Sequence, residues 1–144
     1  MTDEPPCSDD FLRELLSSVR TIALVGASAD AGRPSFRVMR YLQTAGYRVI
    51  PVNPTLAGGE ILSEAVFPDL SSIVEPVDMV DIFRRSEFAG AVSDAAVVIG
   101  AKAVWMQLGV RDDDAAERAR RAGLKIVMNR CPKIEIERLT RQTI

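Results

Sequence analysis

The sequence predicts an α/β fold, in which a single doubly wound domain has a five-stranded, mainly parallel sheet with helices on both faces. The first observation is the kind of strand. Runs such as Ile22 to Val25 are apolar at every position, which is typical of strands buried on both faces. The second is that such runs alternate with helical segments over short loops, and right-handed crossovers then make the sheet parallel. The third is length, because 144 residues suffice for one domain with a proper core.

The chain starts with an expected disordered lead, residues 1 to 8, and the folded domain is expected to span residues 9 to 144. A short first helix is predicted from a cap at Asp9 or Asp10 to Val19, because aspartate accepts hydrogen bonds from the free N–H groups at a helix start. The buried side of this helix is expected to carry Phe11, Leu12, Leu15, Leu16 and Val19.

The rest of the chain alternates strands with helices. The expected strands are short and span residues 21–25, 48–52, 77–83, 103–106 and 125–127. Further helices are predicted over residues 35–45, 87–99, 113–122 and 132–139, and a glycine follows each of the first three of these. Between the second and third strands we expect an extended piece around residues 65–67 and one helical turn at residues 70–74.

Composition excludes several classes of protein. A net charge of -2 argues against a nucleic-acid binder, whose affinity depends on a basic surface. No apolar stretch is long enough to cross a bilayer, and the acidic start MTDEPPCSDD differs from a secretory signal, so we expect a cytoplasmic protein. The two cysteines, Cys7 and Cys131, have no CxxC spacing and no histidine companions, so neither a disulfide scaffold nor a zinc site is indicated.

Residues 21–34, TIALVGASADAGRP, place an apolar strand directly before a glycine turn that opens onto a helix. Gly26 lets the backbone turn sharply, while Ala27 and Ser28 keep side chains small where a phosphate would approach. The helix after Pro34 brings free N–H groups and a positive dipole end to the same place. This pattern predicts a nucleotide-binding turn. The alternative is a tight β-to-α turn that binds no ligand.

The kind of nucleotide is indicated partly by what is missing. A dinucleotide site needs G-x-G-x-x-G and an acidic residue about 20 positions further on, which holds the ribose hydroxyls. Neither is present, and no Asp or Glu lies between Asp30 and Glu60. The region carries Arg33, Ser35 and Arg37 instead, and a guanidinium matches a phosphate with two parallel hydrogen bonds. A ligand with an extra phosphate is therefore favoured over NAD. The alternative for any single arginine is a solvated surface charge.

Residues that follow the predicted strands are further candidates, because ligands of such sheets bind beyond the carboxyl ends of the strands. Those that follow the second, third and fourth strands are Asn53 and Pro54, then Phe83, Arg84 and Arg85, then Gln107. Asn53 can instead start an Asx turn, and Phe83 can either stack on a purine or pack in the core. Trp105 is predicted to pack in the core, and residues 112–114, all aspartate, to cap a helix rather than bind a metal.

Five segments, in order, resemble a known family: GASADAGRPSFRVMRYL, YRVIPVNPT, VDMVDIFRRSE, GAKAVWMQLGV and VMNRCPKIE. They look like the small, single-domain CoA-binding proteins, which are similar to the CoA-binding domain of the succinyl-CoA ligase α subunit. The likeness covers roughly residues 12–139. It implies a Rossmann-like fold that binds coenzyme A (CoA), or an acyl-CoA, at the carboxyl edge of the sheet.

The resemblance also implies roles for individual residues. Those placed around the pyrophosphate are Gly26, Ala27, Ser28 and Arg33. Asn53 and Pro54 are implied to line the nucleotide, and residues 83–85 to flank the rest of the ligand. CoA fits the absence of an acidic ribose partner, since it carries a 3′-phosphate as well as a pyrophosphate. Ser35, Arg37 and Gln107 complete the expected set of binding residues.

Catalysis by this chain alone is not expected. Succinyl-CoA ligase works through a phosphorylated histidine on a second domain, whereas this chain has no histidine and one domain. The alternative function is an enzyme that depends on NAD(P) or another nucleotide. Cys131 follows the last strand and either forms a mixed disulfide with CoA or packs as an inert residue. A homo-oligomer or a protein partner also stays open.

Overall fold

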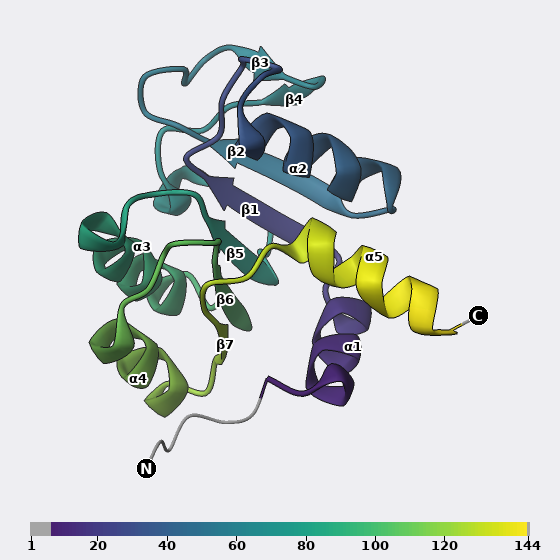
Figure 1. Cartoon of the computed structure of the whole chain (residues 1–144). Coiled ribbons are helices and arrows are strands. Elements are labelled where there is room, and N and C mark those ends of the chain that lie inside the picture. Colours follow the sequence, from purple (N-terminus) through teal and green to yellow (C-terminus); the bar gives the residue numbers. More distant parts are fainter. Residues whose placement is uncertain (1–6, 144) are drawn as a thin grey trace.

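The computed structural model describes residues 7–143. Its centre is a parallel sheet of five strands in the order β2-β1-β5-β6-β7 (Figure 1). The strands are β1 (Thr21–Val25), β2 (Arg48–Val52), β5 (Met79–Ile82), β6 (Ala103–Met106) and β7 (Lys125–Val127). The chain leaves β1 toward β2 on one side and returns to β5 on the other. The carboxyl ends of β1 and β5 therefore form the switch point at which ligands of such sheets bind.

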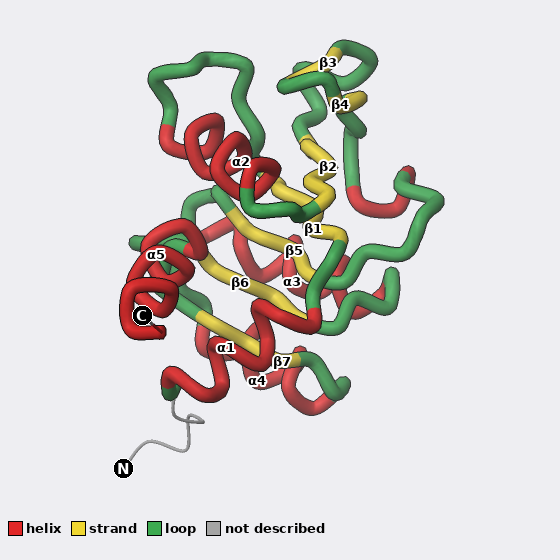
Figure 2. The backbone as a smooth tube through the Cα atoms, turned by 90° about the vertical axis from the view of Figure 1, so that its right-hand side faces the viewer, coloured by secondary structure: helices red, strands yellow, loops and turns green. Residues whose placement is uncertain are grey.

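Helices cover both faces of this sheet (Figures 1 and 2). One face carries α1 (Asp9–Ser18), α2 (Pro34–Thr44) and α5 (Pro132–Thr143), and the other carries α3 (Ser86–Val98) and α4 (Asp113–Arg121). Each face has its own apolar core, because the fully buried strands send alternate side chains to opposite sides. The predicted fold class is therefore confirmed.

Four strands, β1, β2, β6 and β7, have the predicted bounds, whereas β5 is shorter than the predicted strand at residues 77–83. The predicted cap of α1 was wrong. Ser8 is the cap, and its Oγ accepts a hydrogen bond from the N–H of Phe11 at 3.1 Å. Asp9 lies in the first turn, where its charge complements the helix dipole. Residues 1–6 of the expected lead lie outside the described residues.

The last helix is longer than predicted, since α5 continues past Leu139 to Thr143. Neither glycine nor proline follows Leu139, so nothing in the local sequence stops the helix there. Arg138 of this helix also pairs with Asp9 of α1 at 2.9 Å, which joins the two ends of the described chain. The other predicted helices agree with the structure to within their terminal residues.

The connection between β2 and β5 contains a small antiparallel hairpin that the sequence did not predict. It pairs β3 (Glu60–Ile61) with β4 (Glu64–Ala65) through Leu62 and Ser63, which have φ angles of 49° and 70°. Glycine or asparagine is usual in such left-handed positions, so this turn carries no sequence signature. The expected extended piece is present as a parallel bridge of Phe67 to Val52, and the expected helical turn is η1 (Leu70–Ser72).

Candidate functional site

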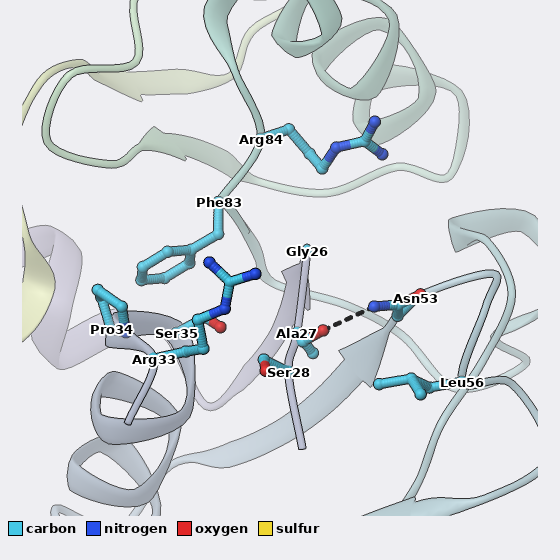
Figure 3. A pocket seen from close by; sticks show the side chains of 10 residues that line it. All are labelled: Gly26, Ala27, Ser28, Arg33, Pro34, Ser35, Asn53, Leu56, Phe83 and Arg84. Carbon is cyan, nitrogen blue, oxygen red and sulfur yellow. Dashed lines mark hydrogen bonds between the residues drawn. The ribbon is translucent and has the colours of Figure 1, made fainter. Parts of the chain in front are cut away.

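A cavity of about 340 Å³ lies at the switch point, between the loops that follow β1, β2 and β5 (Figure 3). Its lining contains eight of the predicted site residues, together with Pro34 and Leu56. These eight are Gly26, Ala27, Ser28, Arg33, Ser35, Asn53, Phe83 and Arg84. The topology therefore brings together residues that are up to 58 positions apart in sequence (84 − 26). We call this space the first cavity.

Gly26 is required at its position by close contact with the protein itself. Its φ angle is +95°, and a Cβ atom added there would lie 2.3 Å from the carbonyl oxygen of Phe83. The N–H groups of Gly26 and Ala27 both donate to the carbonyl oxygen of Val52, at 3.0 and 3.3 Å. The turn after β1 is thus held against the ends of both neighbouring strands, which leaves no space for a side chain.

Asn53 joins the loop after β2 to this turn. Its Nδ2 donates to the carbonyl oxygen of Ala27 at 2.8 Å, and its Oδ1 accepts from the N–H of Thr55 at 2.8 Å. The second bond is the Asx turn that the sequence suggested as the alternative. Pro54 lies within this turn and lines neither this cavity nor the one next to it.

The N-terminus of α2 opens on the first cavity without a capping side chain. Arg33 occupies the cap position and makes no side-chain cap bond, and Pro34 is the first helical residue. By contrast, Ser8 caps α1 and Asp112 caps α4. The N–H groups in the first turn of α2 and the positive end of its dipole are therefore available to an anion.

Arg33 extends its guanidinium into the first cavity, toward Phe83 and the Gly26 turn (Figure 3). Among the described residues its guanidinium has neither a hydrogen bond nor an ion pair, whereas seven other arginines of this chain pair with a carboxylate. A planar cation that faces a cavity without a protein partner suits a phosphate or a carboxylate of a ligand.

The other predicted arginines lie differently. Arg84 points away from the first cavity, and its guanidinium lies 4.8 Å from the centre of the Phe88 ring (Figure 3). Arg85 lies over the same ring at 5.4 Å. Arg37 donates to the carbonyl oxygen of Gly32 at 2.6 Å and so supports the loop before α2. Of these arginines, Arg33 alone is directed into the first cavity without such a contact.

A second cavity of about 620 Å³ adjoins the first, with which it shares Pro34, Phe83 and Arg84. Its lining includes three more predicted residues, Arg37, Arg85 and Gln107. The remaining wall is largely apolar and comes from α2, the loop after β6 and the start of α5. Its members are Val38, Leu108, Gly109, Val110, Cys131, Lys133 and Ile134.

Val38, Val110 and Ile134 of this wall were not among the residues that the sequence singled out. Leu108 and Ile134 are 55% and 47% exposed, which is unusual for large apolar side chains at an edge rich in polar groups. Gln107 is only 6% exposed, and its Oε1 has no hydrogen-bond partner among the described residues. The second cavity therefore combines an apolar wall with an unused hydrogen-bond acceptor, as ligand pockets commonly do.

A buried acid lies below this edge, in the middle of β5. Asp81 is 0% exposed, and neither carboxyl oxygen has a partner among the described residues. Burial raises the pKa of this carboxyl well above its usual range. Asp81 lies beside Leu24 and Trp105 in the sheet and lines neither cavity. Trp105 is fully buried, which confirms its predicted packing role, and its Nε1 donates to the carbonyl oxygen of Arg130.

Within residues 7–143 the structure gives no indication of a metal site or of a membrane-spanning helix. No group of three or more metal-ligating side chains is present there, and none of the helices in that range combines the length and apolar character needed to cross a bilayer. The acidic residues at 112–114 begin α4, as predicted. Asp112 caps the helix by accepting from the N–H of Ala115 at 3.0 Å.

The switch-point cavity, the glycine turn and the uncapped helix together define a Rossmann-like domain whose sheet edge has the features of an anion site. Residues 20–137 match the sequence family described as the CoA binding domain, and the chain belongs to this family. The resemblance noted from the sequence is therefore confirmed. A relative is the uncharacterized protein YneT of Bacillus subtilis (strain 168), which is 34% identical over 123 residues, 85% of this chain and 90% of YneT.

Solved structures agree with this assignment. A protein from Thermus thermophilus is 37% identical, with a TM-score of 0.87, and the match covers 92% of this chain and 98% of that one. A protein from Pyrococcus horikoshii OT3 is also 37% identical, with a TM-score of 0.88, and the match covers 97% and 99%. Part of an acetyl-coenzyme A synthetase from Ca. Korarchaeum cryptofilum shares the fold at 24% identity, with a TM-score of 0.65, over 76% of this chain and 26% of that one.

Proposed function

We propose that this chain binds coenzyme A or an acyl-CoA at the carboxyl edge of its parallel sheet and performs no catalysis of its own. The observation that carries the proposal is the guanidinium of Arg33. It extends into the first cavity beside an uncapped helix N-terminus and has no partner among the described residues. Membership of the CoA binding domain family supports CoA as the source of the phosphates.

The two cavities fit the two parts of such a ligand. The first cavity is the more polar of the two, and there the pyrophosphate would meet Arg33, the Gly26 turn and the N–H groups at the start of α2. The second cavity is larger and more apolar, and it would take the pantetheine arm and any acyl group. Phe83 lines both cavities and would lie where the two parts of the ligand join.

Several observations disfavour the alternative, an NAD(P)-dependent enzyme. The residue that follows β2 is Asn53, whose amide is engaged with Ala27 and Thr55, so this position offers no carboxylate to a ribose diol. The chain has no histidine, and hence no Ser-His or Cys-His pair to activate a nucleophile. We therefore propose a carrier or sensor role rather than a catalytic one.

Melting temperature measured with a panel of ligands tests the proposal. CoA and acetyl-CoA should stabilise the protein and NAD should not, with NADP and ATP as further comparisons. A ligand at about 100 times its dissociation constant adds about 2.7 kcal/mol of stability, which a thermal shift detects readily. Equal shifts with NAD and CoA would contradict the proposal, and a larger shift with NADP would favour the enzyme.

The proposal also covers the cellular compartment of the protein and its binding partners. We place the protein in the cytoplasm, where CoA is handled, and propose neither nucleic-acid nor membrane binding for a chain of net charge -2. Whether the domain acts as a homo-oligomer or with a protein partner is tested by light scattering with and without CoA. Cell fractionation tests the compartment.

A further inference from the structure

Cys131 lies in the wall of the second cavity, at the start of the last helix. It follows β7 by way of a short loop, precedes Pro132, and is 5% exposed. The cavity has one other nucleophilic side chain, Lys133, whose ammonium lies 3.5 Å from Glu137 and 5.4 Å from the centre of the Tyr41 ring. The thiol of Cys131 is therefore the candidate for reaction with a bound molecule.

Gln107 gives an independent reason to expect a ligand in this cavity. The side chain is more than nine-tenths buried, lines the same wall, and has an Oε1 without a hydrogen-bond partner among the described residues. A buried acceptor without a partner costs free energy that a ligand N–H group can recover. The pantetheine arm of CoA carries two amide N–H groups and ends in a thiol. Gln107 and Cys131 line the same cavity, so a pantetheine arm bound there would bring its thiol into the space that Cys131 lines.

The positive charge around the second cavity also favours an anionic ligand such as CoA. The charged side chains in the lining of the second cavity are Arg37, Arg85 and Lys133, with Arg84 at the junction, and no Asp or Glu takes part. An anionic molecule is therefore attracted to this space. Glutathione disulfide is also anionic, but it lacks the nucleotide part that the first cavity would hold.

We propose that Cys131 holds CoA through a reversible mixed disulfide, formed by thiol–disulfide exchange with a disulfide of CoA. The inference rests on the proposed function, since the ligand must first be bound. The Cys131 thiol loses its proton, and the thiolate attacks the CoA-side sulfur of the disulfide. A bond forms between Cys131 Sγ and that sulfur, the original S–S bond breaks, and the departing thiolate takes up a proton. One disulfide replaces another, so no further oxidant is needed.

Intact-mass spectrometry without reductant tests whether Cys131 forms the mixed disulfide with CoA. Purified protein is incubated with CoA disulfide, and the expected product is one added CoA, which dithiothreitol removes. Cys131→Ser and Cys131→Ala should gain no adduct, whereas Cys7→Ser, the matched control, should react like the wild type. Glutathione disulfide should react about tenfold more slowly or worse, because bound CoA is held near the thiol at a high effective concentration.

Two further measurements separate this inference from the proposed function. Calorimetry with reduced CoA shows whether the ligand binds, and Arg33→Ala should slow adduct formation in parallel with its loss of affinity. If the protein binds CoA but peptide mapping of the wild type finds Cys131 unmodified, the disulfide proposal is overturned and the binding function stands. An equal rate with glutathione disulfide, or an adduct on Cys7, also overturns it. If reduced CoA does not bind, the proposed function itself fails.

Discussion

The side-chain amide of Asn53 donates a hydrogen bond to the carbonyl oxygen of Ala27 at 2.8 Å, and this bond ties the loop after β2 to the glycine turn after β1. The carbonyl group of the same amide accepts from the N–H of Thr55 at 2.8 Å. Both ends of the side chain are therefore used within the protein. We infer that Asn53 is a positioning residue, which acts on a ligand by holding the turn in place.

Replacing Asn53 should accordingly affect both stability and binding. Asn53→Ala removes both hydrogen bonds and is expected to lower the free energy of unfolding by about 1 to 2 kcal/mol. Asn53→Asp keeps the acceptor for Thr55 but places a carboxylate oxygen against the carbonyl oxygen of Ala27, so it should weaken CoA binding and destabilise the fold at least as much. Urea denaturation and calorimetry measure the two effects. Wild-type affinity in both variants would show that the turn does not depend on this bond.

A second prediction concerns Gly26, where a positive φ angle coincides with a close backbone contact. Gly26→Ala should destabilise the protein by about 2 kcal/mol or more, because the new Cβ meets the carbonyl oxygen of Phe83. Gly123→Ala is the matched control, since Gly123 has the same φ angle of +95° and nothing within 4 Å of an added Cβ. The control should cost about 1 kcal/mol, the penalty of the left-handed conformation alone. Equal losses in urea denaturation would rule out the contact as the cause.

The third prediction concerns pH and the buried carboxyl of Asp81, whose pKa burial raises well above its usual range. An acid with a raised pKa in the folded state binds its proton more tightly there. Its favourable contribution is complete below the unfolded pKa of about 3.9 and is lost as the pH rises through the folded pKa. The melting temperature of the wild type should therefore fall, relative to that of Asp81→Asn, as the pH rises from about 4.

The comparison with Asp81→Asn is needed because other carboxylates act in the opposite direction. Hydrogen bonds from Arg138 and Arg48 lower the pKa values of Asp9 and Glu75, so their contributions are lost at low pH. These groups are the same in both proteins, and the difference between the two melting curves isolates Asp81. Parallel dependence of the two melting temperatures on pH would contradict a raised pKa.

Much of the fold could be predicted because strand and helix signals are local. Strands such as β1 and β6 are apolar at each buried position, and Gly46 and Gly100 end helices with positive φ angles of 103° and 80°. The β3–β4 hairpin could not be predicted, since Leu62 and Ser63 adopt left-handed conformations through tertiary context. The last turn of α5 contacts a residue far away in sequence, since Gln142 accepts a hydrogen bond from Arg13 at 3.0 Å.

Only part of the candidate site could be predicted, because the rest depends on packing between segments that are far apart in sequence. Residues that follow β1, β2 and β5 gather at one edge as topology requires, but sequence could not rank the arginines among them. Arg33 and Arg84 both lie beside the turn, and only packing shows that Arg84 lies over Phe88 while Arg33 enters the cavity. The second cavity depends on how α2 and α5 pack together, which spacing along the chain does not reveal.

The central claim is that Arg33 recognises a phosphate of CoA, and calorimetric titration of CoA into wild type, Arg33→Ala and Arg33→Lys tests it most directly. Arg20→Ala is the matched control, because Arg20 is exposed just before the amino end of β1, at the opposite edge of the sheet. Loss of charge-assisted hydrogen bonds predicts a decrease of about 1.5 to 3 kcal/mol, roughly ten- to hundred-fold in affinity, for Arg33→Ala.

Arg33→Lys should lose nearly as much, since lysine keeps the charge without the planar fork. Wild-type affinity in both Arg33 variants, with Arg20→Ala also unchanged, would contradict the account and remove Arg33 from the site.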